Sequence, residues 1–142
     1  MASRRRARQR ALQILFLWDV RRPEPDAALN QYYDVLYSEE QPQRDPFVGE
    51  LVSGTIEHAP ELDERISKHA EHWRIERMPA VDRNILRLAV YEMTRGGTPP
   101  PVAIDEALEL ARKFSNEESV QFVNGVLDAV AREIPIEGRD RK

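Results

Sequence analysis

The sequence contains 142 residues, which suits one domain or two small helical halves that share a core. Hydrophobic residues make up 41% of it, enough for a packed interior, and this argues against a disordered chain. The absence of cysteine excludes disulfides and thiolate metal sites. No segment approaches the roughly 20 apolar residues of a membrane span, so we expect a cytoplasmic protein that does not cross a membrane.

Charge is distributed unevenly along the sequence. The net charge is −4, but residues 1–22 contain seven arginines and one aspartate and sum to +6, which leaves −10 for the rest. A basic arm on an acidic body is typical of a protein that meets a polyanion at one end. A mitochondrial transit peptide is also arginine-rich, but the apolar residues 14–18 are expected to belong to the core.

Proline residues mark boundaries of the first four predicted helices. The first two run from about Ser3 to Val20 and from Pro25 to Tyr37, and residues 38–45 form a polar loop. Asp45 is expected to cap a third helix that begins at Pro46, in which Gly54 would let another helix approach closely. Pro60 opens a fourth helix, with Leu62, Ile66 and Trp73 on its apolar side.

Glycine and proline also divide the second half. A fifth helix starts near Pro79 and ends at Gly96-Gly97, the prolines at 99–101 form a stiff connector, and a sixth helix covers about Val102 to Lys113. Residues 115–118 fit a Ser-x-x-Glu capping box, so a seventh helix should begin at Asn116 and run to about Glu133. Within it, Gly125 would allow close packing. Because no alternating β pattern is found, we predict an all-α fold of seven helices.

Enzymatic motifs are missing from the sequence. There is no Walker loop, no Gly-x-Gly-x-x-Gly, no His-Glu-x-x-His and no Gly-x-Ser-x-Gly. His69 and His72 are spaced to share a helical face, but two histidines are too few for a metal site. We therefore predict no catalytic residue, no metal and no cofactor.

The strongest functional signal is an arginine run. Guanidinium groups bind phosphates in a bidentate manner and stack on bases, which makes this run a candidate RNA contact that could fold on binding. A solvated tail or a contact with an acidic protein is the alternative. The run consists of Arg4, Arg5, Arg6, Arg8 and Arg10.

Three stretches, at residues 4–16, 82–93 and 101–128, resemble the NusB family of transcription antitermination factors. The most specific elements are Ala-Ile-Asp-Glu-Ala at 103–107 and Phe-Val-Asn-Gly-Val-Leu-Asp at 122–128. The resemblance implies a single NusB-like domain over residues 1–142, a bundle of two three-helix halves plus an extra helix. We assign an arm to residues 1–10, possible halves to 11–75 and 76–134, and a charged tail to 135–142.

The resemblance also implies a function. Proteins of this family bind the boxA element of nascent RNA together with NusE, a ribosomal small-subunit protein. The complex joins an RNA polymerase antitermination complex and promotes processive transcription of rRNA operons. Some members associate with themselves, so a homodimer is a further expectation.

Site residues carried over from the family form two groups. For the partner NusE they are Phe16 and Asp82, although Asp82 also suits an ordinary helix N-terminus. For RNA, aromatic platforms and polar groups suit unpaired bases. Phe114 and Phe122 could equally belong to the core, and Glu118 could equally cap a helix. The RNA group consists of the five arginines together with Phe114, Glu118, Gln121 and Phe122.

Two rival functions remain open at this stage. In one branch of the family a NusB-like domain precedes the catalytic domain of an RNA methyltransferase, which would require this sequence to be a fragment. Alternatively, the chain is a helical adaptor that binds only proteins, with its arginines on an acidic protein.

Overall fold

The computed structural model describes residues 4–36, 45–70 and 73–134, and they form seven α-helices and one short 3-10 helix, with no strand among them. The predicted loop at 38–45, His72 and the tail at 135–142 lie wholly or almost wholly outside the described residues. None of the described helices is long and apolar enough to cross a membrane. The helices are α1 (Arg4–Arg21), α2 (Pro25–Leu36), α3 (Pro46–Glu57), α4 (Ala59–His69), η1 (Ile75–Arg77), α5 (Ala80–Thr94), α6 (Pro100–Phe114) and α7 (Glu117–Arg132).

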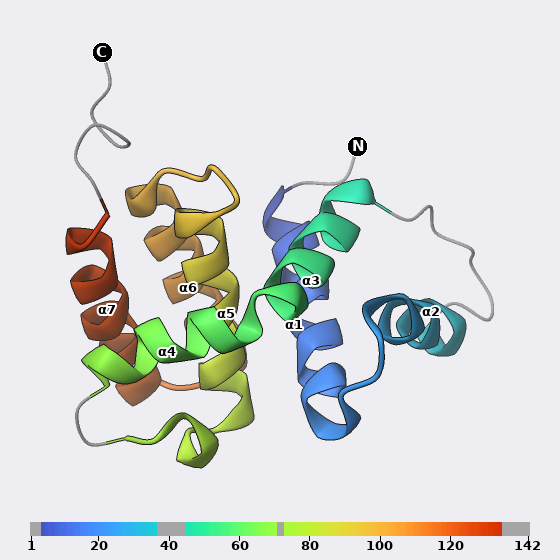
Figure 1. The fold of residues 1–142 in the computed structure, drawn as a ribbon, viewed down its shortest axis with the longest axis horizontal. Coiled ribbons are helices and arrows are strands. Elements are labelled where there is room, and N and C mark those ends of the chain that lie inside the picture. Colours follow the sequence, from blue (N-terminus) through green and yellow to red (C-terminus); the bar gives the residue numbers. More distant parts are fainter. Residues whose placement is uncertain (1–3, 37–44, 71–72, 135–142) are drawn as a thin grey trace.

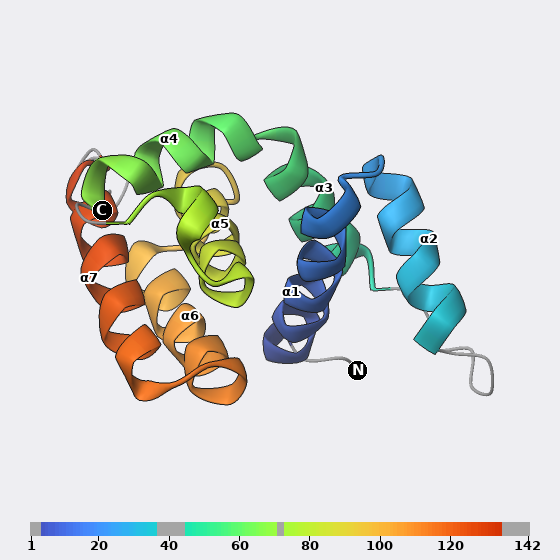
Figure 2. The same cartoon turned by 90° about the horizontal axis from the view of Figure 1, so that it is seen from below.

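The helices form two groups, which Figures 1 and 2 show side by side. One group contains α1, α2 and α3, and the other contains α5, α6 and α7, with α4 lying across α5 and α7. The predicted division near residue 76 placed α4 with the first group, whereas in the structure α4 packs with the second. The chain passes between the groups at His58, which separates α3 from α4.

Helix α5 is the centre of the fold. It packs against α1, α3, α4, α6 and α7, and every residue from Ile85 to Met93 is buried. Because a helix that is buried all round must also bury its polar residues, Arg87 and Glu92 need partners inside the protein.

Two helix starts differ from the prediction. Pro100 and Pro101 belong to the first turn of α6 and are not part of a connector, because the first turn of a helix needs no N–H donors. At α7 the N-cap lies one residue later than predicted, and the Ser-x-x-Glu capping box does not form. Asn116, and not Ser115, is the N-cap, and its side chain accepts a hydrogen bond from the backbone N–H of Ser119 at 2.8 Å. The predicted cap at Asp45 is confirmed by a 2.9 Å hydrogen bond from the Phe47 N–H.

The two glycines singled out in the sequence have different roles. A methyl group on Gly54 would overlap the ring of Tyr91, so Gly54 does allow α5 to approach α3 closely. Gly125 is exposed, and a methyl group there would meet nothing within 4 Å. The expected packing role of Gly125 is therefore wrong, since it faces away from the neighbouring helices.

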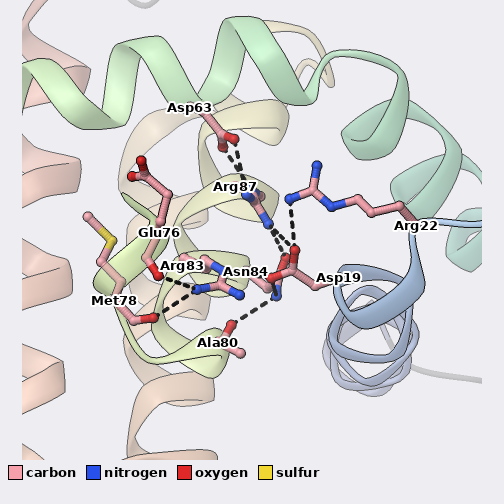
Figure 3. A network of polar contacts seen from close by, with 9 residues as sticks. All are labelled: Asp19, Arg22, Asp63, Glu76, Met78, Ala80, Arg83, Asn84 and Arg87. Carbon is pink, nitrogen blue, oxygen red and sulfur yellow. Dashed lines mark hydrogen bonds and ion pairs between the residues drawn. The ribbon is translucent and has the colours of Figure 1, made fainter. Parts of the chain in front are cut away.

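The carboxylate of Asp19 joins the end of α1 to α5 (Figure 3). Its side chain is 2% exposed. It accepts hydrogen bonds from Arg83 at 2.6 Å and Asn84 at 3.1 Å, and it lies 3.3 Å from Arg87. Arg22 of its own segment donates a further bond at 2.9 Å. Four donors thus surround one buried carboxylate.

Arg87 extends this network to α4. Its side chain is 2% exposed and forms a bidentate ion pair with Asp63 at 2.7 and 3.0 Å. Burial by itself would raise the pKa of Asp19, but the hydrogen bond from Arg83 and the charge of Arg87 outweigh it and lower the pKa from 3.8 to about 2. The side chains of the network therefore remain ionised, and their ion pairs hold α1, α4 and α5 together.

Asp19→Asn should destabilise the protein by about 3 kcal/mol at pH 7, because it leaves Arg87 and Arg83 with one carboxylate fewer inside the protein. Urea unfolding measures this loss. Because the folded-state pKa lies below the unfolded one, the contribution of Asp19 is complete above about pH 4 and is lost as the pH falls through about 2. The difference in the free energy of unfolding between wild type and Asp19→Asn should therefore become smaller as the pH falls through that range.

The control is Asp128→Asn, which removes a carboxylate from an exposed pair with Arg132 on α7. It should cost less than about 0.5 kcal/mol. Equal losses for the two variants would mean that the Asp19 network does not hold the helices together.

Candidate nucleic-acid interface

The arginine run lies at the start of α1 and is already helical from Arg4 onward. Folding on binding is thus not needed for these residues. The first turn contains no acidic residue, so the arginines add to the positive end of the helix dipole. This arrangement costs helix stability but favours phosphate binding at that end.

Arg8 points into the protein and not toward solvent. The residue is 7% exposed, and its guanidinium donates two hydrogen bonds of 2.8 Å to the Glu92 carboxylate. Thr98 donates a third bond to that carboxylate, also at 2.8 Å. The bond to Glu92 raises the pKa of Arg8 further above its ordinary value. In this structure, the guanidinium of Arg8 is occupied by an internal partner.

Arg5 and Arg4 lie at the surface but also contact other helices. Arg5 forms a bidentate pair with Glu106 of α6, at 3.1 and 3.0 Å, while its own side chain stays 56% exposed. The guanidinium of Arg4 lies 3.8 Å from the ring centroid of Phe47 on α3. Both groups retain an open face that a phosphate could approach.

Arg6 is exposed and Arg10 is partly exposed. Because they are four residues apart, they share one face of α1. The structure thus divides the run. Arg8 anchors the helix, whereas Arg4, Arg5, Arg6 and Arg10 are accessible from solvent.

The second predicted group gathers where α6 ends and α7 begins. Glu118 and Gln121 are exposed on α7, and Phe114 and Phe122 are partly buried against the core. Each of the two phenylalanines therefore packs on the core with one side and leaves the other side at the surface, so both alternatives apply in part. The capping alternative for Glu118 loses its support, because the side-chain cap at this start comes from Asn116.

A pocket of about 230 Å³ adjoins this second group. Glu118 and Phe122 line it, and Trp73 and Met78 form part of its apolar wall. Trp73 contacts Phe122 edge to face, with ring centroids 6.5 Å apart. Two of the four predicted RNA residues of this group, Glu118 and Phe122, therefore line a depression in the surface, whereas Phe114 and Gln121 do not.

The two groups lie beside opposite ends of α5. Arg8 pairs with Glu92 near the end of α5, whereas Asp19 pairs with residues near its start, so the two helices are antiparallel. Asp82 at the start of α5 contacts Ser119 at the start of α7. Ten residues of α5 separate Asp82 from Glu92, or about 15 Å along the axis. A ligand that meets both groups must run along the molecule.

Comparison with known proteins identifies the relatives of this chain. A sequence model of the NusB family matches residues 5–132. The transcription antitermination protein NusB of Solibacter usitatus is 78% identical over 135 residues, which cover 95% of this chain and 92% of that protein. NusB of Bacillus subtilis is 45% identical over 93% of this chain and 97% of its own length. The chain belongs to the NusB family.

Solved NusB structures share the fold. The structure of T. maritima NusB matches with a TM-score of 0.82 and 35% identity, covering 96% of both chains. A chain from the crystal structure of antitermination factors NusB and NusE in complex with double-stranded RNA matches with a TM-score of 0.80 and 29% identity, over 92% of this chain and 97% of that one. The expected all-α NusB-like bundle is thereby confirmed.

The two residues expected to face a protein partner have different surroundings in this NusB-family chain. Phe16 is 41% exposed on α1, beside the exposed Leu17 and Val20. Asp82 is 4% exposed, and its carboxylate lies within 3.1 Å of the hydroxyls of Ser115 and Ser119. A buried carboxylate that already accepts two hydrogen bonds is placed to join α5 to α7.

Sequence reasoning missed the internal partners of the arginines and the place of Trp73. Glu92 and Glu106 were not singled out, because they lie more than 80 residues from the arginines that they bind. Trp73 was expected on the apolar side of the fourth helix. Instead α4 ends at His69, and Trp73 is 52% exposed. An aromatic residue followed by two arginines within four positions was the available signal.

Arg8→Ala should lower the free energy of unfolding by about 3 kcal/mol, because it leaves the Glu92 carboxylate buried without a cation. Arg6→Ala removes the same charge from an exposed position and should cost less than about 0.5 kcal/mol. Urea unfolding of both variants tests this division. A loss at Arg8 no larger than at Arg6 would contradict the internal role of Arg8.

Proposed function

We propose that this chain is an RNA-binding transcription antitermination factor of the cytoplasm. It binds boxA RNA together with NusE, the ribosomal small-subunit protein, within an antitermination complex on RNA polymerase. The expected outcome is processive transcription of rRNA operons. The observation that carries the proposal is the set of accessible arginines at the start of α1, within the segment that matches the NusB family.

Several observations support RNA as the ligand of that end. The accessible arginines lie at the positive end of a helix dipole, which attracts phosphate. The remainder of the chain is acidic, which disfavours nonspecific binding of nucleic acid elsewhere on the surface. A solved relative of this chain is a NusB that was crystallised with NusE and double-stranded RNA.

A patch on α1 suits a protein partner. Phe16, Leu17 and Val20 are 41%, 49% and 72% exposed, and a cluster of apolar residues on the surface of one helix is typical of an interface. Ribosomal proteins are basic, so an acidic body favours their approach. We therefore assign NusE to the face of α1 that carries Phe16. The buried Asp82 carboxylate, which accepts hydrogen bonds from Ser115 and Ser119, would act on the partner only by positioning the start of α5.

Arg5→Ala with Arg6→Ala should weaken boxA binding roughly tenfold, because the variant has two accessible cations fewer. Fluorescence anisotropy of a labelled boxA RNA, with and without NusE, measures the affinity, and a scrambled RNA measures selectivity. The slope of log K against log salt should become shallower by about 0.7 for each phosphate that the variant no longer neutralises.

The matched control is Arg65→Ala with Arg132→Ala, which removes two cations from α4 and α7, far from the arm. It should leave RNA affinity within about twofold of wild type. Equal weakening by both double variants would show a general charge effect and move the RNA site away from the arm.

Glu106→Gln should strengthen RNA binding, by roughly twofold to fivefold, because Glu106 competes with phosphate for Arg5. The same anisotropy titration measures the change. Glu64→Gln removes an equal charge from an exposed site on α4 and serves as the control. If Glu106→Gln and Glu64→Gln bind RNA with equal affinity, Glu106 does not compete specifically with phosphate for Arg5.

A further inference from the structure

Thr98 lies in the turn between α5 and α6 and contacts Glu92 in two ways. Its hydroxyl donates a hydrogen bond of 2.8 Å to the Glu92 carboxylate, and its backbone N–H donates one of 3.0 Å to the Glu92 carbonyl oxygen. Gly97 has a φ of 78°, a left-handed conformation that glycine adopts without strain, and it follows the end of α5. The turn therefore holds Thr98 against Glu92 through main chain and side chain together.

Glu92 in turn holds Arg8 inside the protein. The side chains of Arg8 and Glu92 are 8% and 3% exposed. Oε1 of Glu92 accepts hydrogen bonds from Nη2 of Arg8 and from Thr98, while Oε2 accepts one from Nε of Arg8. A bidentate pair requires a particular rotation of the carboxylate. Because Thr98 provides the third donor, its hydroxyl favours the rotation that Arg8 needs.

The described part of the arginine arm, residues 4–10, depends on this anchor. Its first turn begins with three arginines and contains no acidic residue, so the helix dipole disfavours a helical conformation there. Arg5 pairs with Glu106 while 56% exposed, and an exposed ion pair contributes little to stability. The buried pair of Arg8 is therefore the polar contact that fixes the rotation of the arm.

We propose that Thr98 is a positioning residue for RNA binding. Through Glu92 and Arg8 it keeps the start of α1 helical, with Arg6 and Arg10 on the outer face. An arm that is already ordered binds more tightly, because its backbone and side chains lose less freedom when RNA is bound. This inference rests on the proposed function and assigns a role in it to a residue of the α5–α6 turn, which acts without contacting RNA.

The first test is Thr98→Val, which removes the hydroxyl but keeps a branched side chain and the backbone N–H. It should weaken boxA binding roughly threefold to tenfold, because the arm must then be ordered when RNA binds. The slope of log K against log salt should stay unchanged, because every arginine of the arm remains. This distinguishes Thr98→Val from Arg5→Ala with Arg6→Ala, for which the slope becomes shallower.

Rescue by a conservative variant shows whether the hydroxyl is responsible. Thr98→Ser keeps a hydroxyl that can donate to the Glu92 carboxylate, so its RNA affinity should lie within about twofold of wild type. The same anisotropy titration measures the affinities of both Thr98 variants. If Thr98→Ser binds as weakly as Thr98→Val, the hydroxyl does not position the arm.

Amide hydrogen exchange measures the order of the arm without RNA. In α1 the N–H groups of residues 8–12 donate to the carbonyls of residues 4–8, so fraying of the arm exposes them to solvent. These amides should exchange roughly tenfold faster in Thr98→Val than in wild type. NMR of the full-length protein follows each of these amides separately.

Thr94 provides the matched control. It lies in the last turn of α5, and its hydroxyl donates a 2.7 Å hydrogen bond to the Val90 carbonyl of the same helix. Thr94→Val therefore removes the same group from the same region but breaks a bond within a single helix. RNA affinity and exchange in the arm should both stay within about twofold of wild type.

The outcomes separate this inference from the proposed function. If Thr98→Val binds boxA RNA like wild type, or if Thr94→Val weakens binding equally, Thr98 does not position the arm. If Thr98→Val weakens binding while exchange in the arm is unchanged, its effect does not pass through the arm, and the inference is again wrong. If wild type does not select boxA over scrambled RNA, the proposed function fails, whereas exchange in the two threonine variants still decides whether Thr98 orders the arm.

Discussion

The contact between α1 and α5 is held at each end by buried charge. Asp19 meets Arg83 and Arg87 at one end, and Arg8 meets Glu92 at the other. Buried charges are costly unless they are paired, so each cluster tolerates only the alignment that pairs every member. The two clusters therefore fix how far α1 slides along α5 and how it is rotated. Apolar packing alone would specify this register less strictly, because leucine and valine contacts survive small shifts.

That fixed rotation decides which side of α1 is available for binding. With Arg8 turned inward, Arg6 and Arg10 share the outer face, and Phe16 and Val20 are left exposed further along the helix. The 18 residues of α1 span about 27 Å, so the accessible arginines at its start and the exposed apolar residues near its end belong to one straight element.

Much of the helical architecture was predictable because proline, glycine and capping residues mark helix ends locally. Asp45 before Pro46 and the stop at Gly96 are such signals, and they depend on backbone chemistry within a few residues. The errors have the same local origin. Prolines 100 and 101 fit either a connector or a first turn, and Ser115 and Asn116 are both good caps. The tertiary structure decides at which of these residues each helix begins.

The sequence alone determined the helical class, the basic arm, the acidic body and the family motifs, because each is a property of composition or of short-range order. It could not determine which arginines of the arm are accessible. That depends on Glu92 and Glu106, which are brought to the arm only by the packing of α5 and α6 against α1. The same holds for Asp82, which folding buries, and for Trp73, which folding leaves beside Phe122. Whether a side chain is buried depends on residues far away in the chain, and only the tertiary structure brings them together.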